Sequence, residues 1–143
     1  MASPTLILGG RVIPVRSRLE LQQSYEPLGG SSRRRMASGA AFSMIRWQRW
    51  RTTIQGAGWL PAALLCVDFT MPYEIHCVQP VSLCANDELP PGWRARTDFT
   101  LPPEHDEHAG LIRLVYPVFK VCSDRPKFST GINPSWELIC EEV

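Results

Sequence analysis

Proline spacing is the feature of this sequence that most limits its fold. From Pro72 onwards a proline or a proline pair recurs about every ten residues, and the 143-residue chain holds thirteen prolines in all. Proline removes a helical hydrogen bond and clashes with the preceding turn, so it leaves little room for long helices. Between the prolines lie short runs typical of strands, such as Tyr73–Val78, Leu111–Val121 and Trp136–Cys140. Short strands separated by Gly/Pro turns predict an all-β sandwich or barrel.

The N-terminal part fits the same class. Thr5–Leu8 and Arg11–Val15 flank a Gly-Gly pair, and glycine supplies the positive φ that a two-residue hairpin turn needs. Alternating polarity over Arg18–Tyr25 predicts a half-buried strand. The length suits one domain, and we expect a single β domain over residues 1–143.

The stretch after Tyr25 is harder to interpret. Pro27–Arg35 contains Gly-Gly and Ser-Ser pairs and is predicted to be a flexible loop that carries three adjacent arginines. Phe42–Ile54 fits either a helix or a long strand, and its Thr-Thr-Ile end favours the strand. Leu60–Leu65 follows as one short helical turn.

A near-neutral total conceals a strong charge asymmetry. The chain has 15 Lys and Arg against 14 Asp and Glu. Residues 1–60 hold nine arginines and two acidic residues, a net charge of +7, whereas residues 61–143 hold six basic and twelve acidic residues, a net charge of −6. Such an asymmetry can serve the binding of a nucleic acid or join copies head to tail, or the two halves mix within one fold and cancel locally.

Several function classes lack their sequence signatures. No G-x-S-x-G motif, marked Cys/His pair or phosphate-binding loop occurs, so we expect no enzyme. No apolar run approaches the ~18–20 residues of a membrane span, and none is expected.

Metal-binding patterns are weak. Five cysteines at long, irregular spacings indicate reduced thiols, and we expect no cofactor. A zinc or iron–sulfur site is left open because ligands need only meet in space. The H-x-x-H pair His105 and His108 follows two prolines and is predicted to lie in a solvated loop. The cysteines that would form such a metal site are Cys66, Cys77, Cys84 and Cys140.

The best candidate for a binding surface is the Arg33–Arg51 stretch, in which six arginines alternate with aromatic residues. Guanidinium groups bind phosphate and rings stack on bases, so a nucleic-acid-binding module is one interpretation. Arg and Trp also dominate protein–protein hot spots, and without a nucleic-acid fold signature we favour a protein interface. Its candidate residues are Arg33, Arg34, Arg35, Arg46, Trp47, Arg49, Trp50, Arg51 and Trp59.

One pattern extends from about residue 19 to residue 80. It comprises Gln23-Ser24-Tyr25-Glu26, Gly29-Gly30, the Arg-Met-x-x-Gly segment Arg35–Gly39, Arg46-Trp47, Thr52–Gly58 with Trp59 and Pro61, Asp68-Phe69, and Ile75–Pro80. In these residues the chain resembles small tail-tip and baseplate (distal tail) structural proteins of bacteriophages with long, flexible tails.

This resemblance implies a virion component that is made in the bacterial cytoplasm, ends up in the phage tail, and contacts its own copies and the tube, hub or fibres. Some tail-tip hub proteins carry an iron–sulfur cluster on four cysteines, but the cysteine spacing here shows no clear match. We expect the strand Trp136–Cys140 to pair with a neighbouring protein's sheet edge.

Overall fold

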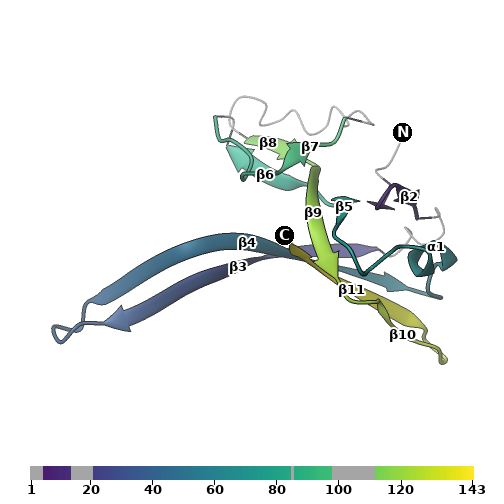
Figure 1. Ribbon diagram of the computed structural model, residues 1–143, viewed down its shortest axis with the longest axis horizontal. Coiled ribbons are helices and arrows are strands. Elements are labelled where there is room, and N and C mark those ends of the chain that lie inside the picture. Colours follow the sequence, from purple (N-terminus) through teal and green to yellow (C-terminus); the bar gives the residue numbers. More distant parts are fainter. Residues whose placement is uncertain (1–4, 14–20, 85, 98–111) are drawn as a thin grey trace.

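The computed structural model describes residues 5–13, 21–84, 86–97 and 112–143. Antiparallel strands dominate the described residues, which confirms the all-β prediction (Figure 1). The short helix α1 falls inside the predicted helical turn. The elements are β1 (Ile7–Leu8), β2 (Arg11–Val12), β3 (Gln22–Arg35), β4 (Ala41–Ala57), α1 (Ala62–Leu65), β5 (Tyr73–His76), β6 (Val81–Cys84), β7 (Arg94–Ala95), β8 (Ile112–Val115), β9 (Pro117–Ser123), β10 (Lys127–Ser129) and β11 (Ser135–Glu142).

Nine of these strands form one sheet. Its order is β2-β1-β5-β9-β11-β4-β3, with β10 paired to β11 and β7 paired to β9. Strands β6 and β8 form a separate two-stranded sheet. The β1–β2 hairpin turns through Gly9 and Gly10 at φ of 57° and 81°, as predicted from the Gly-Gly pair. Strand β4 confirms the strand interpretation of Phe42–Ile54.

The nine-stranded sheet bends around the hydrophobic core. Leu8 of β1 and Ile54 of β4 stand far apart in the strand order, yet they are fully buried in one cluster with Phe119 and Leu138. Figure 1 shows β9 crossing between the upper strands, which include β5, and the lower strands β11 and β4. The two ends of the sheet therefore face each other across the core, in a sandwich-like arrangement.

The loop predicted over Pro27–Arg35 is wrong. These residues belong to β3, which pairs with β4 from Gln22 to Arg35. Glycine and serine suggested a flexible segment, but a 17-residue partner strand rich in aromatic and β-branched residues supplies the backbone hydrogen bonds.

The single strand predicted over Leu111–Val121 is also wrong as one element. It divides at Tyr116 into β8, which pairs with β6, and β9, which pairs with β5, β7 and β11. Pro117 is the first residue of β9, a position where its missing N–H is tolerated. Leu111 lies outside the described residues.

The expected sheet edge at Trp136–Cys140 is wrong. Strand β11 lies inside the sheet, between β4 on one side and β9 and β10 on the other. Its alternate residues Trp136, Leu138 and Cys140 are buried in the core, which fixes the strand in the interior. The ends of the sheet order are instead β2 and β3.

Candidate protein–protein interface

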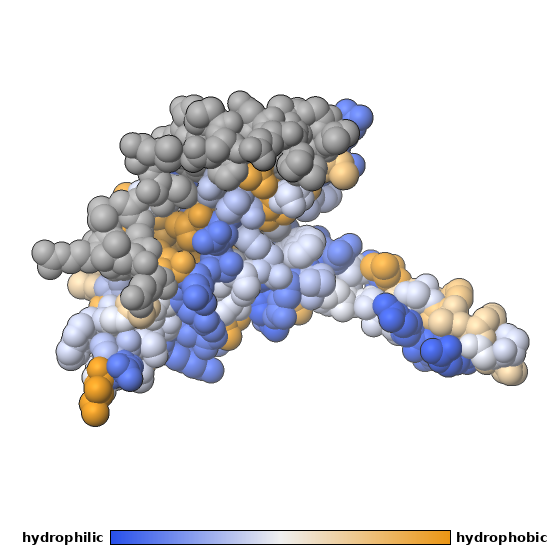
Figure 2. Space-filling view, turned by 180° about the vertical axis from the view of Figure 1, so that it is seen from behind, coloured by the Kyte–Doolittle hydropathy of each residue, from blue (hydrophilic) through white to orange (hydrophobic). Residues whose placement is uncertain are grey.

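The β3–β4 hairpin extends far beyond the rest of the sheet. Strand β11 pairs with β4 only from Arg51 to Ala57, so the outer part of β4 has β3 as its one neighbour among the described strands. Every residue from 31 to 49 is exposed. We call residues 31–49 the arm, and the rest of the described protein the body. Figures 1 and 2 show the arm projecting away from the body.

Local features of the sequence shape the arm. At its tip, Met36 N–H donates to the carbonyl of Ala40 at 2.9 Å and Gly39 adopts a φ of 86°, which closes the turn. At its base a β-bulge interrupts the pairing between Gly29 and Ser31. The indole of Trp47 packs onto Gly30, where a methyl group would overlap the ring.

The arm is strongly basic. It holds five arginines and no acidic residue. Among the described residues none of these arginines forms an ion pair; Arg35 donates to the carbonyl of Gly39 at 3.0 Å and Arg49 to that of Gln48 at 3.1 Å. The arginines are Arg33, Arg34, Arg35, Arg46 and Arg49.

The arm also exposes several large apolar side chains. Ile45 is 68% exposed and Trp47 is 52% exposed, and Met36, Phe42 and Met44 lie exposed on the same hairpin. Figure 2 shows hydrophilic and hydrophobic residues intermixed along it. Large exposed apolar groups beside unpaired arginines are the composition of a protein–protein contact surface.

Trp50 and Arg51 differ from the arm, although the sequence grouped them with it. Trp50 is half-buried against Trp93, with ring centroids 5.9 Å apart. Arg51 lies between Glu26 at 2.7 Å and Glu141 at 2.8 Å, and these hydrogen bonds raise its pKa, with Glu141 the larger cause. Both residues anchor the base of the hairpin to the body. Trp59 is 74% exposed and follows the other end of β4, away from the arm.

The two halves pack against each other where β1 pairs with β5 and where β4 pairs with β11, but their opposite charges form a described ion pair at the base of the hairpin. Among the described residues, Arg51–Glu141 is the ion pair that joins the basic half to the acidic half. The arm keeps its positive charge unpaired.

A groove lies in the corner where the arm leaves the body, a hollow visible at the right of Figure 2. It holds about 430 Å³. Glu142 accepts a hydrogen bond from the backbone N–H of Trp50 at 3.1 Å, which fixes its carboxylate there. The lining residues are Gln48, Arg49, Trp50, Leu83, Asp87, Glu88, Leu89, Pro90, Pro91 and Glu142.

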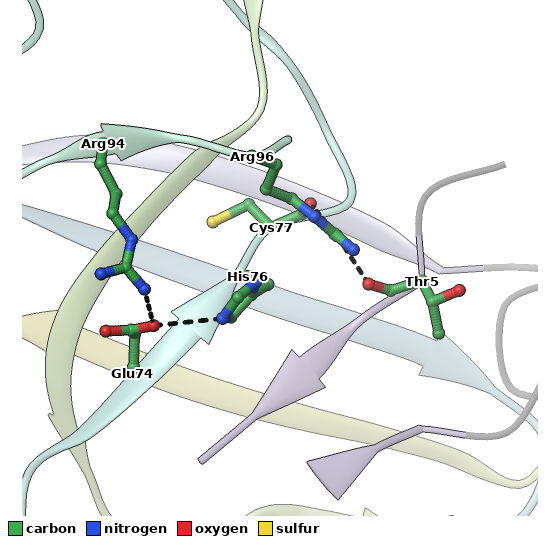
Figure 3. A network of polar contacts seen from close by, with 6 residues as sticks. All are labelled: Thr5, Glu74, His76, Cys77, Arg94 and Arg96. Carbon is green, nitrogen blue, oxygen red and sulfur yellow. Dashed lines mark hydrogen bonds and ion pairs between the residues drawn. The ribbon is translucent and has the colours of Figure 1, made fainter. Parts of the chain in front are cut away.

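A second polar cluster ties β1, β5 and β7 together (Figure 3). Glu74 of β5 forms an ion pair with Arg94 and a hydrogen bond with His76 at 3.2 Å. Arg96 is 9% exposed and donates to the backbone carbonyls of Thr5 at 2.6 Å and Cys77 at 2.9 Å. These contacts join segments distant in the sequence, which gives the cluster a structural role.

The candidate cysteine ligands do not come together. Cys66 and Cys84 are exposed, whereas Cys77 and Cys140 are buried. Within the described part of the chain, no three His, Cys, Asp or Glu residues are grouped to hold a metal ion. His105 and His108 lie outside that part.

The two buried thiols are predicted not to react with thiol reagents in the native protein. Desolvation raises the pKa of Cys77 to about 11 and that of Cys140 to about 12, so almost no reactive thiolate forms at pH 8. We expect a chromogenic disulfide reagent to titrate the exposed Cys66, Cys84 and Cys122 in the native protein, and all five cysteines in denaturant. Native labelling of Cys77 or Cys140, located by peptide mass spectrometry, would contradict this arrangement.

Sequence reasoning missed half of this surface. It named the arginines and Trp47, but not the exposed Met36, Met44 and Ile45 of the arm. It also missed the groove, whose acidic residues come from separate segments. One signal was present: no acidic residue occurs between Glu26 and Asp68.

Comparison with known proteins identifies no relative of this chain. Protein-family models, curated proteins and solved structures were searched, and none matched this chain. In the described residues no helix has the length and hydrophobicity needed to cross a membrane.

Proposed function

We propose that this chain is a structural assembly protein whose arm binds a neighbouring protein, and that the assembly is the tail tip or baseplate of a bacteriophage. The single observation that carries the assembly role is the arm itself: a basic, partly apolar hairpin whose residues are all exposed and lie outside the core cluster. The phage tail is proposed from the resemblance over residues 19–80.

Physical chemistry supports a partner for the arm. An isolated two-stranded ribbon is marginally stable in water, because it buries little apolar surface. The arm also exposes the large side chains of Phe42, Ile45 and Trp47, which a partner would remove from water. Its base is held by the pairing of β4 with β11, by the ion pair of Arg51 with Glu141 and by the contact of Trp50 with Trp93, so the arm is presented in a defined direction.

The proposed place of action is the phage particle. The chain would be made in the bacterial cytoplasm and incorporated into the tail beside its own copies and the tube, hub or fibre proteins. The role needs no catalytic group, since a structural protein acts through its interfaces.

The test combines particle composition with association in solution. We expect mass spectrometry of purified phage particles that encode this chain to detect it, and light scattering to find the purified protein in a defined oligomer. A protein that is absent from particles and monomeric at all concentrations tested would refute the proposal.

Nucleic-acid binding is the competing outcome. The arm's arginines would bind phosphate in a salt-dependent way. Its exposed Met36, Met44 and Ile45 side chains, however, make no favourable contact with a phosphate backbone. We expect no mobility shift of DNA or RNA at ~50 mM salt. A shift lost on reversing the arm charges, in a protein that stays monomeric, would favour the competing function.

A further inference from the structure

We infer that the partner of the arm is a second copy of this chain, and that the arm of one copy docks in the groove at the base of the next copy's arm. This inference rests on the proposed assembly function and names the partner and the docking site.

The groove matches the arm in chemistry. Three carboxylates, those of Asp87, Glu88 and Glu142, line it together with one arginine, Arg49. The arm carries arginines with no acidic residue. Complementary charge of this kind directs association and fixes orientation.

The apolar parts match as well. Besides the carboxylates the groove presents Leu83, Leu89, Pro90, Pro91 and the half-buried Trp50. Proline and leucine surfaces suit Trp47, Phe42 and the methionines of the arm, while the carboxylates of the groove pair with guanidinium groups. Arginine is suited to such contacts because its planar fork binds carboxylates in pairs and stacks on aromatic rings.

The tip of the arm has no access to the groove of its own chain. The groove includes Gln48, and the strand runs outward from there to Ala41 at ~3.3 Å per residue. Arg35 pairs with Ala41, so the arginine-rich tip lies about 20 Å from its own groove. The arginines at the tip therefore reach a groove of this kind only on another copy, while Arg49 at the base lines the groove of its own chain.

Symmetric pairing of two arms is disfavoured. An antiparallel contact between two β3 edges would bring arginines of both arms close together unless the register avoided it, and like charges across a strand pair are destabilising. Pro27 also deprives this edge of one backbone donor. A contact of arm to groove is instead heterologous, so it forms a ring if the rotation closes and a filament if it does not.

A charge-swap experiment tests the docking site. The arm variant is Arg34→Glu/Arg35→Glu, the groove variant is Glu88→Lys, and the control is Asp124→Lys, which makes the same charge change at an exposed position outside the groove. Sedimentation velocity at low salt would measure self-association of each full-length protein. Circular dichroism and thermal melting would confirm that each variant is folded.

We expect the arm and groove variants each to self-associate at least tenfold more weakly than the wild type, and the control to associate like it. An equimolar mixture of the arm and groove variants should regain association, because the acidic arm meets the lysine groove and the basic arm meets the acidic groove.

The two proposals fail separately. If the wild type associates and Glu88→Lys associates equally well, or if the mixture recovers nothing, the docking site is wrong while the assembly function stands. If the wild type is monomeric yet present in phage particles, the partner is another tail protein and the second copy is excluded. If it is monomeric and absent from particles, the proposed function itself fails.

Discussion

Replacing residues 30–47 with an Asn-Gly turn is expected to abolish assembly and leave the body folded. Gly29 and Gln48 are paired across the hairpin, so the shortened strands keep their register, and Asn-Gly suits a two-residue hairpin turn. Residues 31–47 are all exposed and lie outside the core cluster, and surface changes away from packed features usually shift stability by no more than about 0.5 kcal/mol. Light scattering should find a monomer whose melting temperature lies within about 2 °C of the wild type.

Mixing the shortened protein with the wild type provides a control. It retains Glu88 and Glu142, so its groove is intact, and a 1:1 mixture with wild-type protein should form capped complexes in place of larger assemblies. An oligomer of undiminished size from the shortened protein would show that the arm is not the assembly element. A large fall in melting temperature would show that the arm supports the body.

A large loss of stability is expected from Gly56→Ala. Gly56 of β4 lies directly across from Trp136 of β11, and the buried indole packs onto its Cα, where a methyl group would overlap the ring. Overpacking at a buried site costs about 1–3 kcal/mol. Because Trp136 is 2% exposed and both strands are interior, we expect a loss of about 2–3 kcal/mol, or a melting temperature lower by about 6–9 °C.

Gly131→Ala is the matched control. An added methyl group there meets no atom within 4 Å, and the residue is exposed and has no positive φ. Urea unfolding of both variants would separate the specific overlap at Gly56 from the general effect of replacing glycine. Equal stability of the two variants would mean that Trp136 is free to shift, and that the close packing of β4 on β11 is not required.

Short-range signals predicted the strands and turns best. The Gly9-Gly10 hairpin, the strand ending in Thr52-Thr53-Ile54 and the turn before Leu65 follow from φ preferences and β-branched residues, which act locally. The outer part of strand β3 was wrongly predicted to be a loop, because its strand conformation depends on pairing with β4. Gly29, Gly30 and the serines have little preference of their own, and the sequence does not reveal that Trp47 needs a glycine opposite it.

The candidate surface was predictable only in part, for a similar reason. Arginines and tryptophans are conspicuous in one stretch, so composition alone located the arm. Composition does not show that Arg51 is neutralised by Glu26 and Glu141 while Arg34 is not, because that depends on which strands are neighbours. The groove joins the end of β11 to the segment after β6, a contact set by the tertiary fold.

The central position of β11 has a consequence for biosynthesis. During translation β4 leaves the ribosome some 80 residues before β11, its neighbour on the side away from β3. Until β11 is complete, the nascent sheet stays divided between β9 and β4, with open strand edges on both sides of the gap and a core that lacks Trp136, Leu138 and Cys140. Pairing across such a long separation is intrinsically slow. The arm therefore belongs to a complete sheet only once β11 has paired with β4 and β9, so the proposed assembly through the arm would follow synthesis past residue 142.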